Sequence, residues 1–234
     1  MEGEIVGKHK MILWSRPKDV DLDNMTNIAY DMLTLLRNYG DEISPKYLTS
    51  RKKSLTKEFV MDRNSTRSLL EKSIDKTSLE LFNRLTSRIS FFSSMDDEKS
   101  SGISIDVGNC DPMFNNTFVV HLPESFSGFS EKRNDFVSLF KDLIEIFEPY
   151  YGFVSIDNKN QPGKEFWLNN KPTCVHWMNY YDAKTASTIG IELVLSIAEI
   201  EKLRDGYFFM LNDDPLDNNS IVQMQREVKE LLGL

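Results

Sequence analysis

The chain has 234 residues, a formal net charge of −8 and 40% hydrophobic residues, including 15 Phe, 8 Tyr and 3 Trp. This length and apolar content are ordinary for a soluble protein with one sizeable core, so we expect a single domain over residues 1–234. The acidic balance argues against nucleic acid as a partner, because carboxylates repel the phosphate backbone, and favours a basic partner.

The lack of a recognisable targeting signal and the spacing of the cysteines predict a cytoplasmic protein. Charged residues interrupt the first 17 positions, which leaves no apolar core for a signal peptide. Apolar runs are broken by Asp, Glu or Lys well before the length of a membrane span. The two cysteines, Cys110 and Cys174, match no zinc, haem or thioredoxin spacing and are typical of a reducing compartment.

The N-terminal half predicts two helices and several short strands. Residues 21–40 carry apolar side chains at helical spacing, with acidic residues first and a glycine last. A second helix is expected to be capped by Asn64 or Ser65. Strands are expected at 9–15, 58–61, 87–95, 102–108 and 117–122. Apolar and polar residues alternate in 102–108, which predicts a sheet with one wet face.

The C-terminal half begins after a weak internal break near residues 123–134, which are rich in Ser and Gly. An amphipathic helix follows and is expected to close at Pro149, and a last helix begins at Ser220. Ser196 and Glu199 have the spacing of a capping box, which predicts a short helix that runs to Leu203. Strands are expected at 152–157, 174–181 and 207–211.

These elements define the expected fold class as α+β. Hairpins of strands precede and follow a helical middle, and strands and helices do not alternate regularly. This order predicts a mainly antiparallel β-sheet packed with amphipathic helices.

A thiol, an imidazole and a carboxylate stand close together in the sequence at Cys174, His176 and Asp182. Such groups build nucleophilic sites, but in a strand Cys174 and His176 stand about 7 Å apart, too far for direct activation of the thiol. We therefore interpret them as a packed cysteine beside a surface or hydrogen-bonded histidine. With acidic residues dispersed along the chain, no catalytic residue is singled out, and we expect no enzyme activity.

Motifs for metals and cofactors are incomplete. His9 and His121 have no neighbour at metal-ligand spacing. Gly163 and Lys164 lack the glycine-rich frame of a phosphate-binding loop, and residues 212–219 lack the closing Glu of a calcium loop. We therefore expect no cofactor and no metal.

The order of elements in the C-terminal half carries a family resemblance. A helix ends in the sequence EPYY (148–151), followed by GFVSID (152–157), HWMNYY (176–181) and EKLRDGYFFML (201–211), before PLD and a last helix. Over residues 135–234 this order resembles the immunity protein 52 family of bacterial polymorphic toxin systems. His176 stands where the family favours Gly, and the N-terminal half carries none of its motifs.

The resemblance implies a cytoplasmic antidote that binds and blocks a toxin delivered by a type VI or contact-dependent secretion system. Toxins paired with this family often resemble nucleases of the restriction-endonuclease type, and a nuclease needs a positive cleft for phosphates. An acidic inhibitor is steered toward such a cleft. The densest acidic loops and two aromatic residues are the expected contacts: Asp213, Asp214, Asp217, Asp96, Asp97, Glu98, Trp167 and Tyr180.

Two other classes of function stay open. One is a small hydrolase-type enzyme whose site combines distant carboxylates, or Cys174 and His176. The other is a general protein-interaction adaptor. The sequence leaves the identity of the toxin and the oligomeric state undecided.

Overall fold

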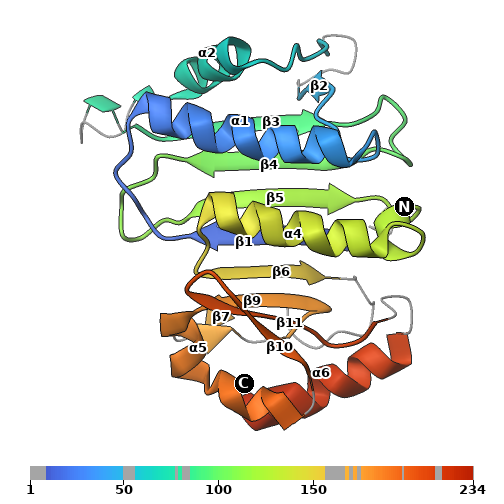
Figure 1. The fold of residues 1–234 in the computed structure, drawn as a ribbon. Coiled ribbons are helices and arrows are strands. Elements are labelled where there is room, and N and C mark those ends of the chain that lie inside the picture. The colour runs from blue at the N-terminus through green and yellow to red at the C-terminus, as the bar shows by residue number, and fades with distance from the viewer. Residues whose placement is uncertain are drawn as a thin grey trace, which may run out of the picture.

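A computed structural model describes residues 9–49, 56–76, 79–80, 85–155, 167–168, 171–172, 175–196, 198–213 and 218–233. Nine antiparallel strands form one sheet in the order β10-β11-β9-β6-β1-β5-β4-β3-β2. Helices pack on this sheet, so the predicted α+β class with a mainly antiparallel sheet is confirmed (Figure 1).

The strands of the large sheet are β1 (His9–Ser15), β2 (Tyr47–Leu48), β3 (Ser87–Phe92), β4 (Gly102–Val107), β5 (Asn116–Leu122), β6 (Tyr151–Ser155), β9 (Met178–Asp182), β10 (Ile200–Leu203) and β11 (Gly206–Met210). A separate two-stranded ladder joins β7 (Trp167–Leu168) to β8 (Lys171–Pro172). The helices are α1 (Leu22–Tyr39), α2 (Arg63–Ser73), α4 (Arg133–Phe147), α5 (Ala183–Ile189) and α6 (Asn218–Leu232), with 3-10 turns η2 (Ser127–Phe129) and η3 (Ile191–Ser196).

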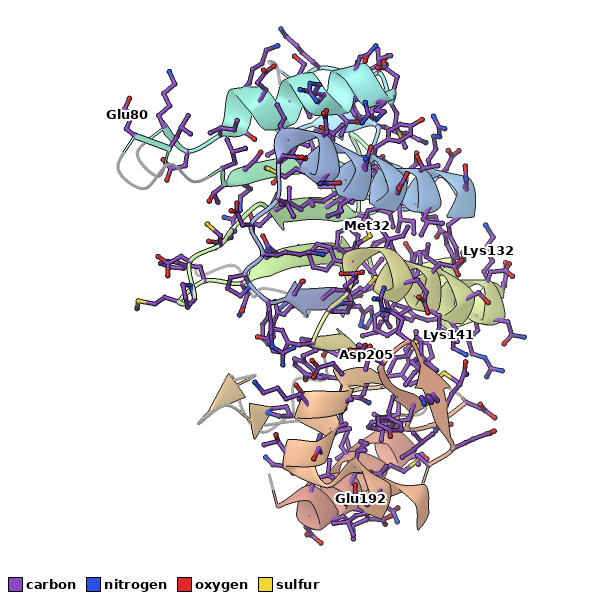
Figure 2. The ribbon with its side chains drawn as sticks, turned by 60° about the vertical axis from the view of Figure 1, so that its left-hand side comes forward. Met32, Glu80, Lys132, Lys141, Glu192 and Asp205 are labelled. Carbon is purple, nitrogen blue, oxygen red and sulfur yellow. The ribbon has the colours of Figure 1, made fainter. Side chains whose placement is uncertain are left out.

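Helices α1 and α4 cross the same face of the sheet side by side (Figure 1). The side chain of Asp21 starts α1 by accepting a hydrogen bond from the backbone N–H of Asn24 at 2.8 Å, and Gly40 ends it. The rings of Tyr39 and Phe136 meet at 6.0 Å, which joins the end of α1 to the start of α4. The two helices therefore run antiparallel over a shared core, in which Met32 is fully buried (Figure 2).

The half of the sheet around β6 and β9 is covered on both faces, and every residue of these two strands is buried. On one face, Gly152 lies under α4, and an added Cβ would stand 2.6 Å from Leu13 Cδ2. On the opposite face, His176 stacks on Phe153 at 3.9 Å, and Gln225 of α6 donates a hydrogen bond to the carbonyl of Val175 at 2.8 Å.

In the other half, the face opposite α1 is open. Buried and partly exposed residues alternate along β3, β4 and β5, as the period-2 pattern of 102–108 predicts. The open face is polar: Asp106 accepts a hydrogen bond from Arg88 at 2.6 Å and another from Thr117 at 2.6 Å, and the hydroxyls of Ser90 and Ser104 lie 3.1 Å apart.

Both edges of the large sheet are protected. At one edge, the backbone of Leu48 and Lys46 bonds to Lys57 and Phe59, which covers β2. At the other edge, β10 exposes the charged side chains of Glu201 and Lys202.

The predicted helix from Ser196 to Leu203 is wrong. Residues 200–203 form β10, which pairs with β11 in a hairpin whose two-residue turn is Arg204–Asp205. Arg204 has φ 51°, and Gly206 is needed because an added Cβ would stand 2.3 Å from the carbonyl oxygen of Tyr181. Pairing in the sheet therefore overrides the local capping signal.

Other boundaries also differ from the prediction, three of them with a bearing on the sites. Helix α2 begins at Arg63 because its cap is Asp62, two positions before Asn64, and the side chain of Asp62 accepts the backbone N–H of Ser65 at 2.8 Å. The strand expected at 174–181 begins only at Met178, and Cys174 lies outside the described residues. The strand expected at 58–61 is reduced to a single bridge between Tyr47 and Glu58.

The predicted weak break near residues 123–134 lies between β5 and α4, and its aromatic residues belong to the core. Phe126 and Phe129 are buried and pack against Phe136 at 4.9 and 5.9 Å. The sheet continues on both sides of this segment. Among the helices in the described ranges, none combines the length and the apolar composition of a membrane span.

Candidate partner-binding surfaces

The predicted acidic loops lie at one end of the sheet but on different flanks. Asp96, Asp97 and Glu98 are exposed in the turn between β3 and β4, where the carboxylate of Asp96 accepts the backbone N–H of Glu98 at 3.1 Å. Asp213 is exposed after β11, and its carbonyl accepts a hydrogen bond from Arg133. Five strand spacings separate β4 from β11, about 24 Å, so these residues do not form one cluster.

Three predicted contacts are described incompletely. Asp214 and Asp217 lie outside the described residues. The backbone of Trp167 is described in β7, where it pairs with Pro172, but its side chain lies outside the described part.

Tyr180 is not a surface contact, which corrects its prediction as a partner-binding residue. Its side chain is 0% exposed, and its hydroxyl donates a hydrogen bond to the Oδ1 of Asp205 at 3.2 Å. Burial, together with the nearby charge of Asp205, raises the pKa of the phenol. The reason is that β9 is covered on both faces, so neither set of alternate residues reaches solvent.

The residues that suggested a nucleophilic site have structural contacts. His176 is fully buried rather than on the surface, and burial lowers its pKa to about 3, so the imidazole stays neutral. Asp182 forms an ion pair with Arg16 and accepts the backbone N–H of Thr185 at 2.8 Å, which caps α5. In the part of the chain that the structure describes, no three His, Cys, Asp or Glu side chains are grouped as metal ligands.

The opposite end of the sheet contains two cavities. The first, of about 360 Å³, lies between the start of α1 and the end of α4, with an apolar floor that includes Ile28 and Phe147. Lys18 and Glu148 line it and form an ion pair at 3.2 Å. Burial opposes ionisation of Glu148, but hydrogen bonding and charge from Lys18 and Arg204 outweigh it and lower the pKa of this carboxyl.

The second cavity, which we call the Tyr150 cavity, has a volume of about 590 Å³ and is lined by Arg16, Tyr150, Lys184, Pro112 and Asn115 among others. The guanidinium of Arg16 lies 4.8 Å from the centre of the Tyr150 ring. Lys184 is exposed and forms no ion pair with a described residue. Both volumes fall within the range of ligand or side-chain binding sites.

A loop over residues 108–115 connects β4 to β5 and lies between the two cavities, since Gly108 lines the first, and Cys110 and Pro112 line the second. Figure 2 shows this loop, in green, projecting beyond the ends of the strands. At its tip, Met113 is 86% exposed and Phe114 is 60% exposed.

Sequence reasoning did not identify the loop or the two cavities. The cavities are assembled from β1, α1, β4, α4 and α5, which are far apart in the sequence. The loop carries a visible signal, because two large apolar residues follow the turn-forming residues Asn109, Asp111 and Pro112.

Comparison with known proteins finds a similar fold in a solved structure but no matching family. No family model and no curated protein matches the chain, so the assignment to the immunity protein 52 family receives no support from them. Among solved structures, the type VI secretion system (T6SS) protein PA0821 of Pseudomonas aeruginosa is similar, with a TM-score of 0.65. The similarity covers 97% of this chain and 73% of PA0821 at 12% sequence identity, and at that identity it establishes the fold alone.

Proposed function

We propose that this chain is a cytoplasmic immunity protein of a bacterial type VI secretion system, which binds and neutralises a cognate toxin. The observation that carries the proposal is the fold that the chain shares, over 97% of its length, with a T6SS protein. The motif order of residues 135–234 supports the immunity role within that system.

The charge of the chain supports a basic toxin, of which a nuclease is our preferred example. A net charge of −8 steers association with a positively charged surface and raises the rate of encounter. Three exposed carboxylates at the β3–β4 turn add to this field at one end of the sheet.

The contacts of the titratable residues favour binding over catalysis. His176 is buried in the core, and the carboxylate of Asp182 forms an ion pair with Arg16 and caps α5. Asp19 and Glu148 both line the first cavity, but the lowered pKa of Glu148 suits an ion pair rather than a proton donor. We therefore prefer the antidote to the hydrolase-type alternative.

The test is protection from a toxin encoded beside the gene. Each neighbouring reading frame is expressed in a sensitive bacterial host, alone and together with this chain. We expect one of them to arrest growth when expressed alone and to be tolerated with this chain, with which it co-purifies as a stable complex. Growth arrest that this chain does not relieve would contradict the immunity function.

A further inference from the structure

The tip of the β4–β5 loop is an exposed apolar feature in an acidic protein. Of the large apolar side chains that are exposed in the described residues, Met113 and Phe114 are the pair adjacent in sequence, and Met113 is the most exposed of all. A lone exposed apolar residue is ordinary, but a paired Met and Phe at the end of a projecting loop has the composition of an interface centre.

The loop is held in place by an internal network of hydrogen bonds. The side-chain amide of Asn116 donates to the carbonyls of Arg16 and Asn109, both at 3.1 Å, and its oxygen accepts the N–H of Asn109 at 2.8 Å. Nearer the tip, Asp111 accepts the N–H of Met113 at 2.9 Å. The tip is therefore ordered before any partner binds, which lowers the entropic cost of binding.

The base of the loop is also fixed in space. Gly108 has φ 80°, and an added Cβ would stand 2.3 Å from the carbonyl oxygen of Leu85. The backbone N–H of Lys18 donates to the carbonyl of Asn109 at 2.9 Å, which ties the loop to the segment after β1. The loop thus keeps a constant position between the two cavities.

The Tyr150 cavity extends the apolar tip with groups that are common in binding hot spots. It presents the tyrosine ring, the guanidinium of Arg16 and the exposed ammonium of Lys184 on one side of the loop. Aromatic residues, Met and Arg are enriched at the centres of protein interfaces, and cavities there accept anchor side chains of the partner.

The charge of the surroundings indicates a partner protein rather than a second copy or a membrane. Two copies of a chain with net charge −8 repel each other. The same net charge disfavours contact with anionic lipids. Lys184, by contrast, offers a local cation for a carboxylate of the partner.

We propose that Met113 and Phe114, together with the Tyr150 cavity, form the surface that binds the toxin, which presents an apolar recess beside a carboxylate. This inference rests on the proposed function. It places the contact at the end of the sheet opposite the acidic β3–β4 turn, so this turn only adds to the net negative charge of the chain, and the apolar tip supplies the binding energy.

The test measures affinity for the toxin that the chain neutralises, purified in a catalytically inactive form, by calorimetry. Replacing both Met113 and Phe114 by Ser is expected to weaken binding about 30-fold or more, the loss typical of a hot spot. Val60→Ser, at an equally apolar position that is 70% exposed elsewhere, is the matched control and is expected to stay within about twofold.

A second variant tests the cavity. Lys184→Glu places a carboxylate beside the carboxylate expected of the toxin and is expected to weaken binding about tenfold. Lys99→Glu makes the same charge change in the exposed turn at the other end of the sheet and is expected to keep the affinity. Circular dichroism and thermal unfolding of all variants show whether the fold is retained.

The outcomes separate the two proposals. If the wild-type chain binds no neighbouring toxin, the proposed function fails. If the wild type binds and the Met113/Phe114 variant, correctly folded, binds equally well, the surface is wrong while the immunity function stands. A wild-type dimer that becomes monomeric in the double variant, or flotation of the wild type with vesicles of anionic phospholipid, would likewise overturn the toxin-binding surface.

Discussion

The two halves of the sheet differ in how many layers they have. Around β6 and β9, both faces of the sheet are covered and each residue is buried, whereas β3, β4 and β5 are covered on one face and carry a polar ladder on the other. The aromatic stretch that carries the family resemblance, 176–181, lies in the covered half and is wholly buried. A resemblance carried by buried residues therefore concerns the core of this chain and gives little information about which surface meets a partner.

Truncation of a buried side chain in the covered half is expected to have the largest effect on stability. Phe153→Ala removes a fully buried ring that stacks on His176 and contacts Tyr151 at 5.3 Å, so the free energy of unfolding should fall by about 3–5 kcal/mol. Urea unfolding of the variant and the wild type measures this difference in free energy. Val119→Ala, a smaller truncation on the open face of the adjacent β1–β5 pair, should cost less than about 1 kcal/mol. Equal losses would contradict the distinction between the two halves.

The buried His176 makes stability depend on pH. Its folded pKa of about 3 lies below the unfolded value near 6.5, so the unfolded state binds a proton first. The stabilisation is complete above the unfolded pKa, and it should be lost below about pH 6.5 at about 1.4 kcal/mol per pH unit until the folded pKa is reached. Urea unfolding from pH 7.5 to 4.5 measures this slope, which should be shallower in His176→Phe. An identical slope in the variant would exclude His176 as its source.

Asp182 links the segment after β1 to the start of α5. It pairs with Arg16 after β1 and caps α5, so Asp182→Ala should lower the free energy of unfolding by about 1–2 kcal/mol. Burial opposes ionisation of this carboxyl, but hydrogen bonds from Arg16 and Thr185 lower its pKa, so its contribution is present above the unfolded pKa and is lost as pH falls through the folded pKa. Thermal unfolding of Asp182→Asn serves as a control for side-chain shape. An Asp182→Ala variant as stable as the wild type would show that the ion pair and the cap contribute nothing measurable to stability.

The smallest effect on stability is expected at the β3–β4 turn. Replacing Asp96 and Asp97 by Asn and Glu98 by Gln should change the free energy of unfolding by less than about 0.5 kcal/mol, because all three side chains are exposed. The association rate with a basic toxin should fall about threefold at low salt and hardly at all at high salt, because salt screens the steering field. Stopped-flow mixing at two salt concentrations measures this, and a loss that persists at high salt would indicate direct contact instead.

Sequence patterns predicted the fold where only one face of an element is buried. The apolar stripes of α1 and α4, and the alternation in 102–108, each give a period that identifies the buried side. In β9 both faces are buried, so the period vanishes and Tyr180 cannot be distinguished from an exposed aromatic residue. At Ser196 and Glu199 a real capping signal was outweighed by the pairing of Ile200 with Phe209.

The candidate site was harder to predict than the fold. The acidic residues were singled out because charge is visible in the sequence, but the five strand spacings that separate β4 from β11 were not visible there. The Tyr150 cavity joins Arg16, Pro112, Tyr150 and Lys184, which are brought together only by strand order. No local pattern encodes that order.

The protected edges of the sheet disfavour the association of one molecule with another. With Lys57 and Phe59 bonded along β2, and with Glu201 and Lys202 exposed on β10, both edges of the described sheet disfavour the addition of a strand from another molecule. For the immunity function proposed above, edges that disfavour sheet extension keep the molecules separate from one another until the toxin binds.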